Sequence, residues 1–228
     1  MKRIVVLTGA GMSAESGIKT FRDADGLWEG HDVMEVASPQ GWHQNQELVL
    51  DFYNQRRRQL FEVRPNRAHE LLAELESQYH INIVTQNVDD LHERAGSSNV
   101  LHLHGELLKV RSIVHENLVY EWKKDLFTGD LCEKGTQLRP HIVWFGEAVP
   151  MLDQAIGITQ LADIVIIIGT SMQVYPAASL INYARPGSEV YFIDPRPNLQ
   201  SSADDNLTVI ADKATSGMEQ LFERLSNF

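Results

Sequence analysis

Short apolar runs alternate along this chain with segments whose hydrophobic residues recur at helical spacing. The runs are rich in β-branched residues and almost free of polar ones, as expected of parallel strands that are covered on both faces. They comprise Ile4–Leu7, Ile81–Val84, Ile164–Ile168 and Val190–Ile193. The clearest helical segments are Ala68–Tyr79 and Ser216–Phe228. This alternation predicts an α/β fold with a doubly wound, Rossmann-like parallel sheet.

Two stretches interrupt the alternation. Residues 30–62 predict helices with no strand, and residues 106–142 predict short β segments with a hairpin that turns at His115–Asn117. We interpret both as insertions that together form a smaller module. The Rossmann-like domain is then expected to consist of residues 1–29, 63–105 and 143–228.

Composition excludes several classes of protein. A net charge of −11 over 228 residues argues against a nucleic-acid partner and favours lysine-rich protein segments, although such a charge can also serve solubility alone. A single cysteine, Cys132, excludes an internal disulfide and a metal site built from several cysteines. The start of the chain is a poor secretion signal, and no apolar run approaches the roughly 20 residues of a membrane helix. We therefore expect a cytoplasmic protein without a membrane partner.

A glycine-rich segment, Gly9–Ala14, follows the first predicted strand and fits the G-x-G-x-x-G/A pattern of dinucleotide-binding turns. Small residues let the backbone approach a pyrophosphate, whose charge suits a helix N-terminus, but a tight strand-to-helix turn would have the same sequence. A dehydrogenase would carry an acidic residue about 20 positions later, at the end of a second strand. Residues 21–28 instead predict turns and no strand, which disfavours hydride transfer.

Longer motifs resemble those of the sirtuin family. Gly9–Ile18 followed by Thr20-Phe21-Arg22 resembles the sirtuin cofactor motif. Further matches follow in family order at Thr85–Asp89, Leu103–Gly105, Leu138–Pro140, Val143–Glu147 and Gly169–Ser171. The resemblance implies an enzyme that uses NAD as co-substrate to remove acyl groups from acylated-lysine segments of other proteins, yielding nicotinamide and O-acyl-ADP-ribose.

The resemblance also implies which residues bind NAD. The glycine turn would hold the pyrophosphate, Gln86 the nicotinamide ribose, and Asn87 and Asp89 the nicotinamide carboxamide and its water. Phe21-Arg22 would close over the nicotinamide end, Asp194-Pro195-Arg196 would flank the adenosine ribose, and Ala214 would lie near the adenine. The whole expected set is Gly9, Ala10, Gly11, Ser13, Glu15, Thr20, Phe21, Arg22, Trp28, Gln86, Asn87, Val88, Asp89, Gly169, Thr170, Ser171, Asp194, Pro195, Arg196 and Ala214.

His104 is the candidate general base. It follows a predicted strand, Val100–Leu103, and directly precedes Gly105; His102 would share its strand face, and the family pattern selects His104. The resemblance implies that the acyl oxygen attacks the ribose carbon as nicotinamide leaves, after which His104 helps deprotonate a ribose hydroxyl. A side chain that titrates near about 6.5 suits this step at neutral pH. Together with Asn87 and Asp89, His104 forms the expected catalytic set.

The resemblance places the substrate peptide between two strand edges, with which it would pair backbone to backbone. One edge is Val143, Trp144, Phe145, Gly146 and Glu147, and the other is the loop that contains Gln173, Val174 and Tyr175. For the aromatic pair in the first edge, ordinary core packing is the alternative.

Tyr53 and Arg56 lie three residues apart in a predicted helix and share a face. They match the Tyr-x-x-Arg pair of the sirtuin class that accepts malonyl- and succinyl-lysine, where the phenol and the guanidinium bind the distal carboxylate. Arg57 and Arg58 are expected to form a solvated basic stripe. We expect succinyl-lysine to be processed, with acetyl- and other short acyl-lysines, lactyl included, also accepted; deacetylation is the main alternative.

The chain departs from the family where typical sirtuins bind zinc through two cysteine pairs. Residues 110–114 contain no cysteine and residues 131–135 contain only Cys132, so we expect no structural zinc; a site from Cys132, His115 and carboxylates is a weaker alternative. Five or six buried side chains at about 1.5–3 kcal/mol each could replace the roughly 10 kcal/mol of a zinc site. The expected apolar replacement is Val110, Ile113, Val114, Leu118, Tyr120, Trp122, Leu126, Phe127 and Leu131.

Two other functions compete with deacylation. The same site could transfer ADP-ribose to a protein, or the chain could be a binding module that responds to NAD without catalysis. The presence of Asn87, Asp89 and His104 argues against the second, because a module that only binds NAD needs no general base.

Overall fold

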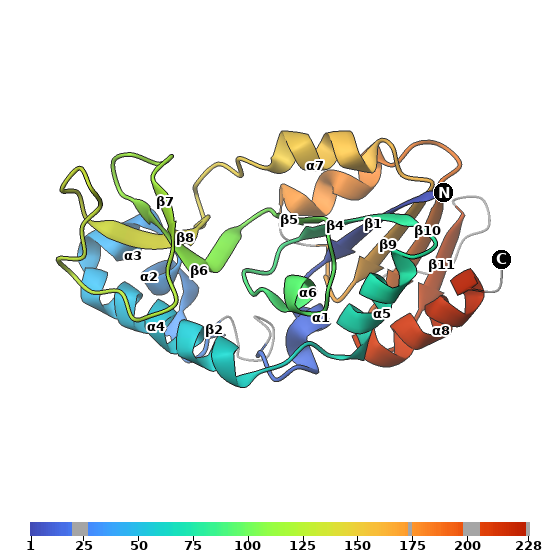
Figure 1. The fold of residues 1–228 in the computed structure, drawn as a ribbon, viewed down its shortest axis with the longest axis horizontal. Coiled ribbons are helices and arrows are strands. Elements are labelled where there is room, and N and C mark those ends of the chain that lie inside the picture. The colour runs from blue at the N-terminus through green and yellow to red at the C-terminus, as the bar shows by residue number, and fades with distance from the viewer. Residues whose placement is uncertain (20–26, 173–174, 198–205, 227–228) are drawn as a thin grey trace.

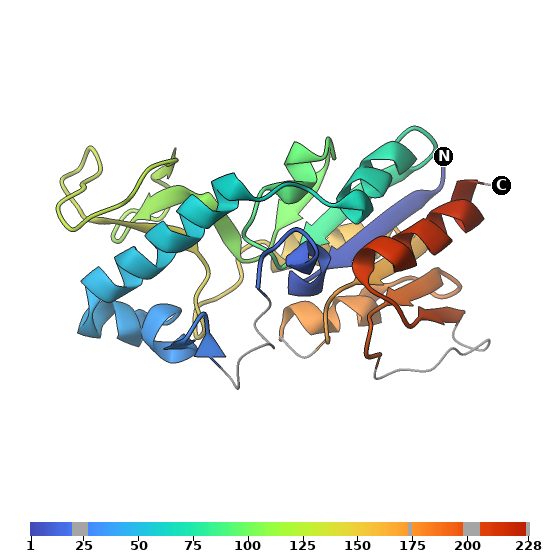
Figure 2. The same ribbon diagram turned by 90° about the horizontal axis from the view of Figure 1, so that it is seen from below.

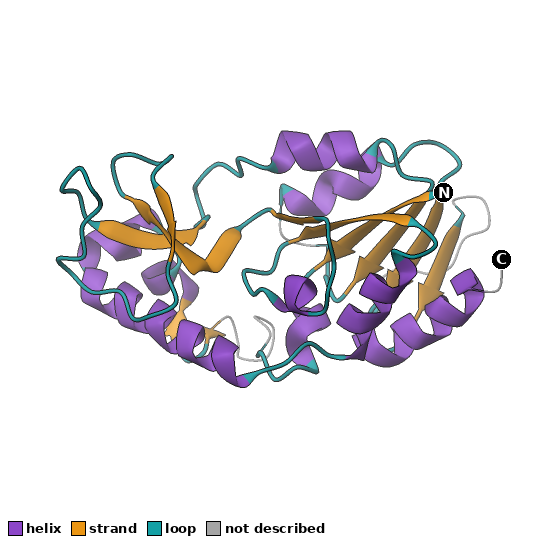
Figure 3. Cartoon of the chain, viewed as in Figure 1, coloured by secondary structure: helices purple, strands orange, loops and turns teal. Residues whose placement is uncertain are grey.

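The computed structural model describes residues 1–19, 27–172, 175–197 and 206–226. Two lobes of unequal size lie next to each other in Figure 1, and both termini belong to the larger one. The larger lobe contains a parallel sheet and the smaller lobe an antiparallel sheet flanked by helices (Figure 3).

The large sheet has six parallel strands in the order β11-β10-β9-β1-β4-β5. The strands are β1 (Arg3–Thr8), β4 (His80–Thr85), β5 (Val100–His102), β9 (Ile164–Ile168), β10 (Glu189–Ile193) and β11 (Leu207–Ile210). From β1 the chain first builds outward through β4 and β5, then returns to the other side of β1 with β9. The predicted doubly wound fold is confirmed, and its switch point lies between β1 and β9.

Alternate residues of each strand face opposite helical layers. Ile4 and Val6 of β1 pack in a core with α5 and α8, whereas Val5 and Leu7 pack in a second core with α7 and η1. In Figure 1, α7 lies on one side of the sheet and α5 and α8 lie on the other. The flanking helices are α1 (Ala10–Ala14), α5 (Arg67–Leu75), α6 (Leu91–Arg94), α7 (Leu152–Thr159), α8 (Ala214–Ser226) and the 3₁₀ helix η1 (Ala177–Tyr183).

The smaller lobe is assembled from the two predicted insertions, which lie side by side (Figure 2). The first contributes β3 (His31–Asp32), α2 (Val33–Val36), α3 (Pro39–Gln44) and α4 (Gln46–Glu62). The strand β2 (Leu27–Trp28), which pairs with β3, lies just before its predicted start at residue 30. The second contributes β6 (Gly105–Ser112), β7 (Val119–Glu121) and β8 (Leu138–Ile142). The hairpin around His115–Asn117 is confirmed, since Arg111 of β6 pairs with Val119 of β7.

The expectation of no strand in residues 21–28 and 30–62 is wrong at one place. Leu27–Trp28 pairs with His31–Asp32 as a two-residue ladder. Its turn is formed by Glu29 and Gly30, both with positive φ angles, 51° and 85°. Two residues per strand are too few to show an alternating pattern in the sequence.

The predicted apolar core of the second insertion is only partly correct. Val110 and Leu126 are fully buried and Leu118, Tyr120 and Trp122 partly so, but Ile113, Val114, Phe127 and Leu131 are exposed. The module does not enclose a core of its own. Its sheet packs against α4, and the shared core includes Phe52, Tyr53 and Cys132.

The sequence predicted a solvated Arg57, and this prediction is wrong. Arg57 is 1% exposed, and burial lowers its pKa to about 10. Its Nε donates to the carbonyl oxygen of Leu107 at 3.2 Å and its Nη1 to Oδ1 of Asn54 at 2.7 Å. Arg57 therefore fastens α4 to β6, whereas Arg58 is exposed and pairs with Asp125.

The described ranges contain neither a metal-binding cluster nor a membrane-spanning helix. No group of three or more His, Cys, Asp or Glu side chains there could hold a metal ion, and the expectation of a zinc-free module stays a prediction. Among the described helices, none is long and apolar enough to cross a bilayer.

Candidate active site

A cavity of about 620 Å³ lies between the two lobes. The segments after β1, β4 and β9 line one side, and α4 and residues 142–149 line the other. Every predicted site residue that the structure describes lines this cavity. Thr20, Phe21, Arg22, Gln173 and Val174 lie outside the described residues.

Sequence reasoning missed several residues that line the cavity. The polar residues among those missed are Lys19, Glu29, Gln59 and Lys213. Gln59 lies three residues after Arg56 on α4, so helical spacing could have identified it. The other three have no such signal, because they stand in turns or before a helix.

The glycines after β1 and β9 pack against each other. A Cβ atom on Gly11 would lie 2.7 Å from the Cα of Gly169, and one on Gly9 would lie 2.7 Å from the Cβ of Thr170. The N–H of Gly11 donates to the Gly169 carbonyl at 2.9 Å. These glycines are therefore required by the fold at the switch point, where they also leave backbone exposed to a ligand.

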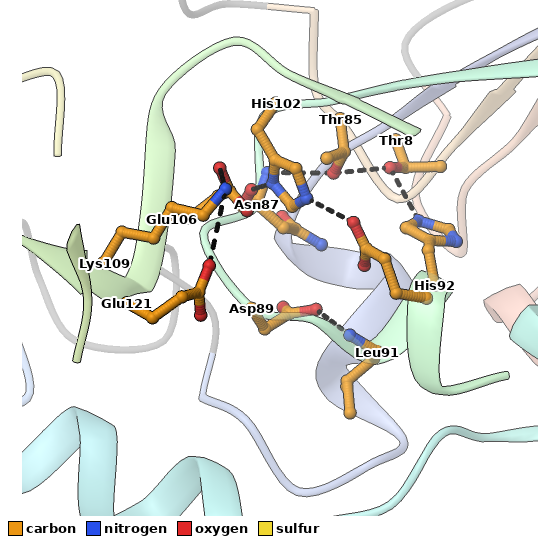
Figure 4. Close-up of polar contacts among 11 residues, drawn as sticks. Thr8, Thr85, Asn87, Asp89, Leu91, His92, His102, Glu106, Lys109 and Glu121 are labelled. Atoms are coloured by element: carbon orange, nitrogen blue, oxygen red, sulfur yellow. Dashed lines mark hydrogen bonds and ion pairs between the residues drawn. The ribbon is translucent and has the colours of Figure 1, made fainter. Parts of the chain in front are cut away.

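Asn87, Asp89 and Ser13 form one hydrogen-bonded group beneath the cavity. Nδ2 of Asn87 donates to the Gly9 carbonyl and to Oγ of Ser13, both at 3.1 Å, which leaves Oδ1 to accept from a ligand. The Ser13 hydroxyl donates to Asp89 at 2.9 Å. Asp89 also accepts from the N–H of Leu91 at 3.2 Å (Figure 4). Burial raises the pKa of Asp89, and these hydrogen bonds oppose the shift. Asn87 and Asp89 thus present mainly acceptors to the cavity.

The protonation of His104 follows from its one polar contact. Nδ1 lies 3.1 Å from the carbonyl oxygen of Gln86, and a carbonyl can only accept, so Nδ1 carries the ring proton. Nε2 is then an unprotonated base. Burial lowers the pKa of His104, and the hydrogen bond to Gln86 opposes this only in part. His104 is therefore neutral at pH 7, as a general base must be.

Tyr53 is fully buried in the small lobe at the wall of the cavity. Its oxygen accepts a hydrogen bond from Nε1 of Trp144 at 3.0 Å, so the phenolic proton remains available to a ligand. Burial raises the pKa of Tyr53, which keeps the phenol protonated.

Arg56 is partly buried and its guanidinium lies 5.0 Å above the ring of Phe52. Its Nε is buried and has no acceptor among the described residues. Burial lowers the pKa of Arg56, while the charges of Glu29 and Asp51 raise it. A guanidinium stays charged at this level of burial, so the cavity contains a cation that an acidic ligand group can pair with.

The predicted substrate edge Val143–Glu147 is a loop in this structure, not a strand. Arg139 holds it: its guanidinium donates to both carboxylate oxygens of Glu147, at 2.6 and 3.1 Å, and lies 3.3 Å above the Trp144 ring. Glu147 in turn accepts from the N–H of Trp144 at 2.8 Å. Trp144 is buried whereas Phe145 is 44% exposed, so core packing accounts for only the first of the two aromatics.

Residues at the far end of the cavity come from β10 and the start of α8. Oδ1 of Asp194 accepts from the N–H of Arg196 at 2.8 Å. Glu15 accepts from both the N–H and the hydroxyl of Thr215, at 2.9 and 2.8 Å. Glu15 thus ties α1 to the first turn of α8 and shapes this end of the cavity next to Ala214.

Comparison with known proteins identifies close relatives. The model of the Sir2 family matches residues 9–176. A protein named NAD-dependent protein deacylase from Helicobacter pylori is 63% identical over 99% of this chain and 98% of its own length. A protein of the same name from Bacteroides thetaiotaomicron is 53% identical over 99% and 98%.

Solved structures with this fold include ligand complexes. A structure described as a Sir2 homolog–NAD complex has a TM-score of 0.86 and 41% identity, and the match covers 99% of this chain and 90% of that one. One described as a Sir2–p53 peptide–NAD⁺ complex has a TM-score of 0.78 and 30% identity over 99% and 94%.

Proposed function

Because this chain belongs to the Sir2 family and is an NAD-dependent protein deacylase, we propose that it removes short acyl groups, succinyl as well as acetyl, from lysine side chains of other proteins. The observation that supports succinyl most is the presence of Tyr53 and Arg56 in the wall of one cavity with His104. The relatives' names state deacylation but not the acyl group.

The donors in this wall suit a carboxylate. Tyr53 has a free phenolic proton, and Arg56 has a buried Nε with no acceptor in the described part of the chain. A carboxylate accepts such hydrogen bonds strongly, and the guanidinium adds charge. A neutral acetyl group would use neither, but no described residue of the wall repels it. The arrangement therefore supports a broad acyl range with a preference for acidic acyl groups.

The described residues also fit NAD at the carboxyl ends of the strands. The close-packed glycines after β1 and β9 would hold the pyrophosphate, and Asn87 with Asp89 would accept from the carboxamide. When bound, NAD would supply the ribose carbon that the acyl oxygen attacks, the nicotinamide that leaves, and the ribose hydroxyl that takes up the acyl group. The chain supplies His104, whose unprotonated Nε2 can take a proton from a hydroxyl in the cavity. That free base also argues against a module that only binds NAD.

Nicotinamide release from NAD, measured with matched peptides, tests this proposal. We expect release to require an acylated peptide and to proceed with succinyl-, acetyl- and lactyl-lysine versions of one sequence. Release without peptide, with ADP-ribose attached to an unmodified protein, would instead support ADP-ribosyl transfer. Release with the acetyl peptide alone would remove succinyl from the proposed range.

A further inference from the structure

His102 lies two residues before His104 and does not line the cavity. It ends β5, and its side chain is only 8% exposed. Nδ1 lies 3.0 Å from the carbonyl oxygen of Asn87, and Nε2 lies 2.7 Å from Oε1 of Glu93 on α6 (Figure 4). Both ring nitrogens are therefore engaged at hydrogen-bonding distance.

These two partners determine the protonation of the ring. A carbonyl oxygen and a carboxylate can only accept, whereas a neutral imidazole has one N–H and one bare nitrogen. Both contacts are hydrogen bonds only if His102 is an imidazolium. His102 is thus charged, whereas His104, two residues later in the sequence, is neutral.

The surroundings of His102 favour its charged form. Burial by itself disfavours the imidazolium, but the hydrogen bond and charge of Glu93 outweigh it and raise the pKa of His102. The other charged groups that face the ring are Glu106 on β6 and Asp89 after β4. His92 on α6 also faces it and is neutral, since burial holds its pKa well below the ordinary value.

His102 holds one side of the Asn87 peptide while a second chain of hydrogen bonds holds the other. The N–H of Asn87 donates to Oγ1 of Thr85 at 3.0 Å, which also accepts from Thr8 at 2.8 Å. Since the Thr8 proton is used there, its oxygen accepts from Nε2 of His92 at 3.1 Å. Asn87 belongs to no helix or strand, so these contacts fix its position (Figure 4).

We propose that His102, held as an imidazolium by Glu93, is a positioning residue that fixes the Asn87 peptide for binding of the nicotinamide group, and that this hold is lost when His102 gives up a proton as the pH rises. The proposal rests on the proposed function, because that function assigns Asn87 to the nicotinamide end of the cavity. When the ring is neutral, one contact places a bare nitrogen against a lone pair and must open. Because the pKa of His102 is raised, the hold is fully present below the ordinary histidine value of about 6.5 and is lost as the pH rises through the raised pKa.

Two uncharged variants separate the two contacts of the ring. The amide of His102→Asn reaches about the position of Nδ1 and can still donate to Asn87. The amide of His102→Gln reaches about the position of Nε2 and can donate only to Glu93. Glu93→Gln keeps an acceptor for the ring but removes the charge that favours the imidazolium. His80→Gln, an exposed histidine at the start of β4, is the matched control.

Calorimetric titration with NAD and with ADP-ribose, from pH 6.5 to 9, measures the effect. ADP-ribose lacks the nicotinamide, so a positioning role changes NAD affinity selectively. We expect His102→Gln to bind NAD at least tenfold more weakly at pH 7, with ADP-ribose changed less than twofold. His102→Asn should retain more of the NAD affinity. In the wild-type protein the NAD affinity should fall as the pH rises through the pKa of His102, and both variants should lose this fall. In Glu93→Gln that fall should begin at least one pH unit lower than in the wild-type protein.

Equal weakening of NAD and ADP-ribose by His102→Gln would reduce His102 to a structural role, and unchanged NAD affinity would remove the proposal. If His102→Gln does not fold, Glu93→Gln decides the question. The proposal is removed if its NAD affinity falls over the same pH range as that of the wild-type protein. The titrations need no acylated substrate. Absence of deacylation would therefore overturn the proposed function while the difference between NAD and ADP-ribose still decides the role of His102.

Discussion

Replacing Arg56 with methionine tests whether the cavity recognises an acidic acyl group. Methionine retains most of the length and the apolar stem of arginine, and it can still lie over the Phe52 ring. It removes the charge and all donors. Deacylation of a succinyl peptide should fall, whereas deacylation of the acetyl version of the same peptide should change little.

The size of the loss follows from the surroundings of Arg56. A hydrogen bond to a charged group contributes about 1.5–3 kcal/mol, which corresponds to roughly ten- to 150-fold in affinity. Two features favour the lower end: Tyr53 remains to donate to the carboxylate, and Glu29 and Asp51 already offset part of the Arg56 charge. We expect kcat/KM for the succinyl peptide to fall about ten- to thirtyfold, and that for the acetyl peptide less than threefold.

Both peptides should be assayed side by side by nicotinamide release, with peptide mass as a second readout. Arg58→Met is the matched control, because Arg58 lies on the same helix but is exposed and pairs with Asp125 at 2.5 Å. It should leave both activities unchanged. An equal loss on both substrates in Arg56→Met would show that Arg56 shapes the small lobe and does not select the acyl group.

Three further outcomes are expected. His104→Ala should lower turnover a hundredfold or more, within the roughly 10²–10⁴ attributed to a general base. Its affinity for NAD, measured by calorimetry, should stay nearly intact. Since burial lowers the pKa of His104, kcat/KM of the wild-type protein should decline only below about pH 6.5, the ordinary histidine value. Elemental analysis of the purified protein should find no stoichiometric zinc, and a chelator should leave its thermal unfolding unchanged, because the chain has one cysteine where a typical site needs four; about one zinc per chain would contradict this prediction. Glu29→Gln should raise kcat/KM for succinyl peptides a few-fold relative to acetyl ones, because it removes an anion that competes for Arg56; a fall would mean that Glu29 is needed to orient the guanidinium.

The central strands β1, β4 and β9 could be predicted from the sequence because they are buried on both faces, whereas the edge strand β11, which is only partly buried, was not predicted. A run such as Ile164–Ile168 leaves no polar position to confuse the period, and the observed strand has the same bounds. The Leu27–Asp32 ladder could not be predicted, because each strand has two residues and the turn uses Glu29, not the usual Asn or Gly, at a positive φ. Local pattern is informative only where it is long enough to repeat.

The residues of the candidate site could likewise be predicted where the local sequence determines their position, and could not where contacts with a distant segment determine it. Residues that follow a strand, such as Asn87, Asp89 and His104, meet at one edge because the carboxyl ends of parallel strands must do so. Arg57 and Arg58 show the limit. Adjacent on α4, they differ by about 100° around the helix axis, so one enters the core and the other meets solvent. Which face of α4 is buried depends on β6, some 50 residues later.

In the small lobe the second insertion shares its core with the neighbouring helix α4. A zinc site fastens a module to itself, whereas here the second insertion is fastened to α4. Arg57 donates to Leu107 of β6, and Asn54 both accepts from the N–H of Leu126 at 2.8 Å and donates to its carbonyl at 2.9 Å. Each contact satisfies a buried backbone group that would otherwise cost about 1–3 kcal/mol. Because Tyr53 and Arg56 lie on the same helix, the contacts that would replace zinc also set the position of the acyl pocket, and loss of Asn54 should disturb both.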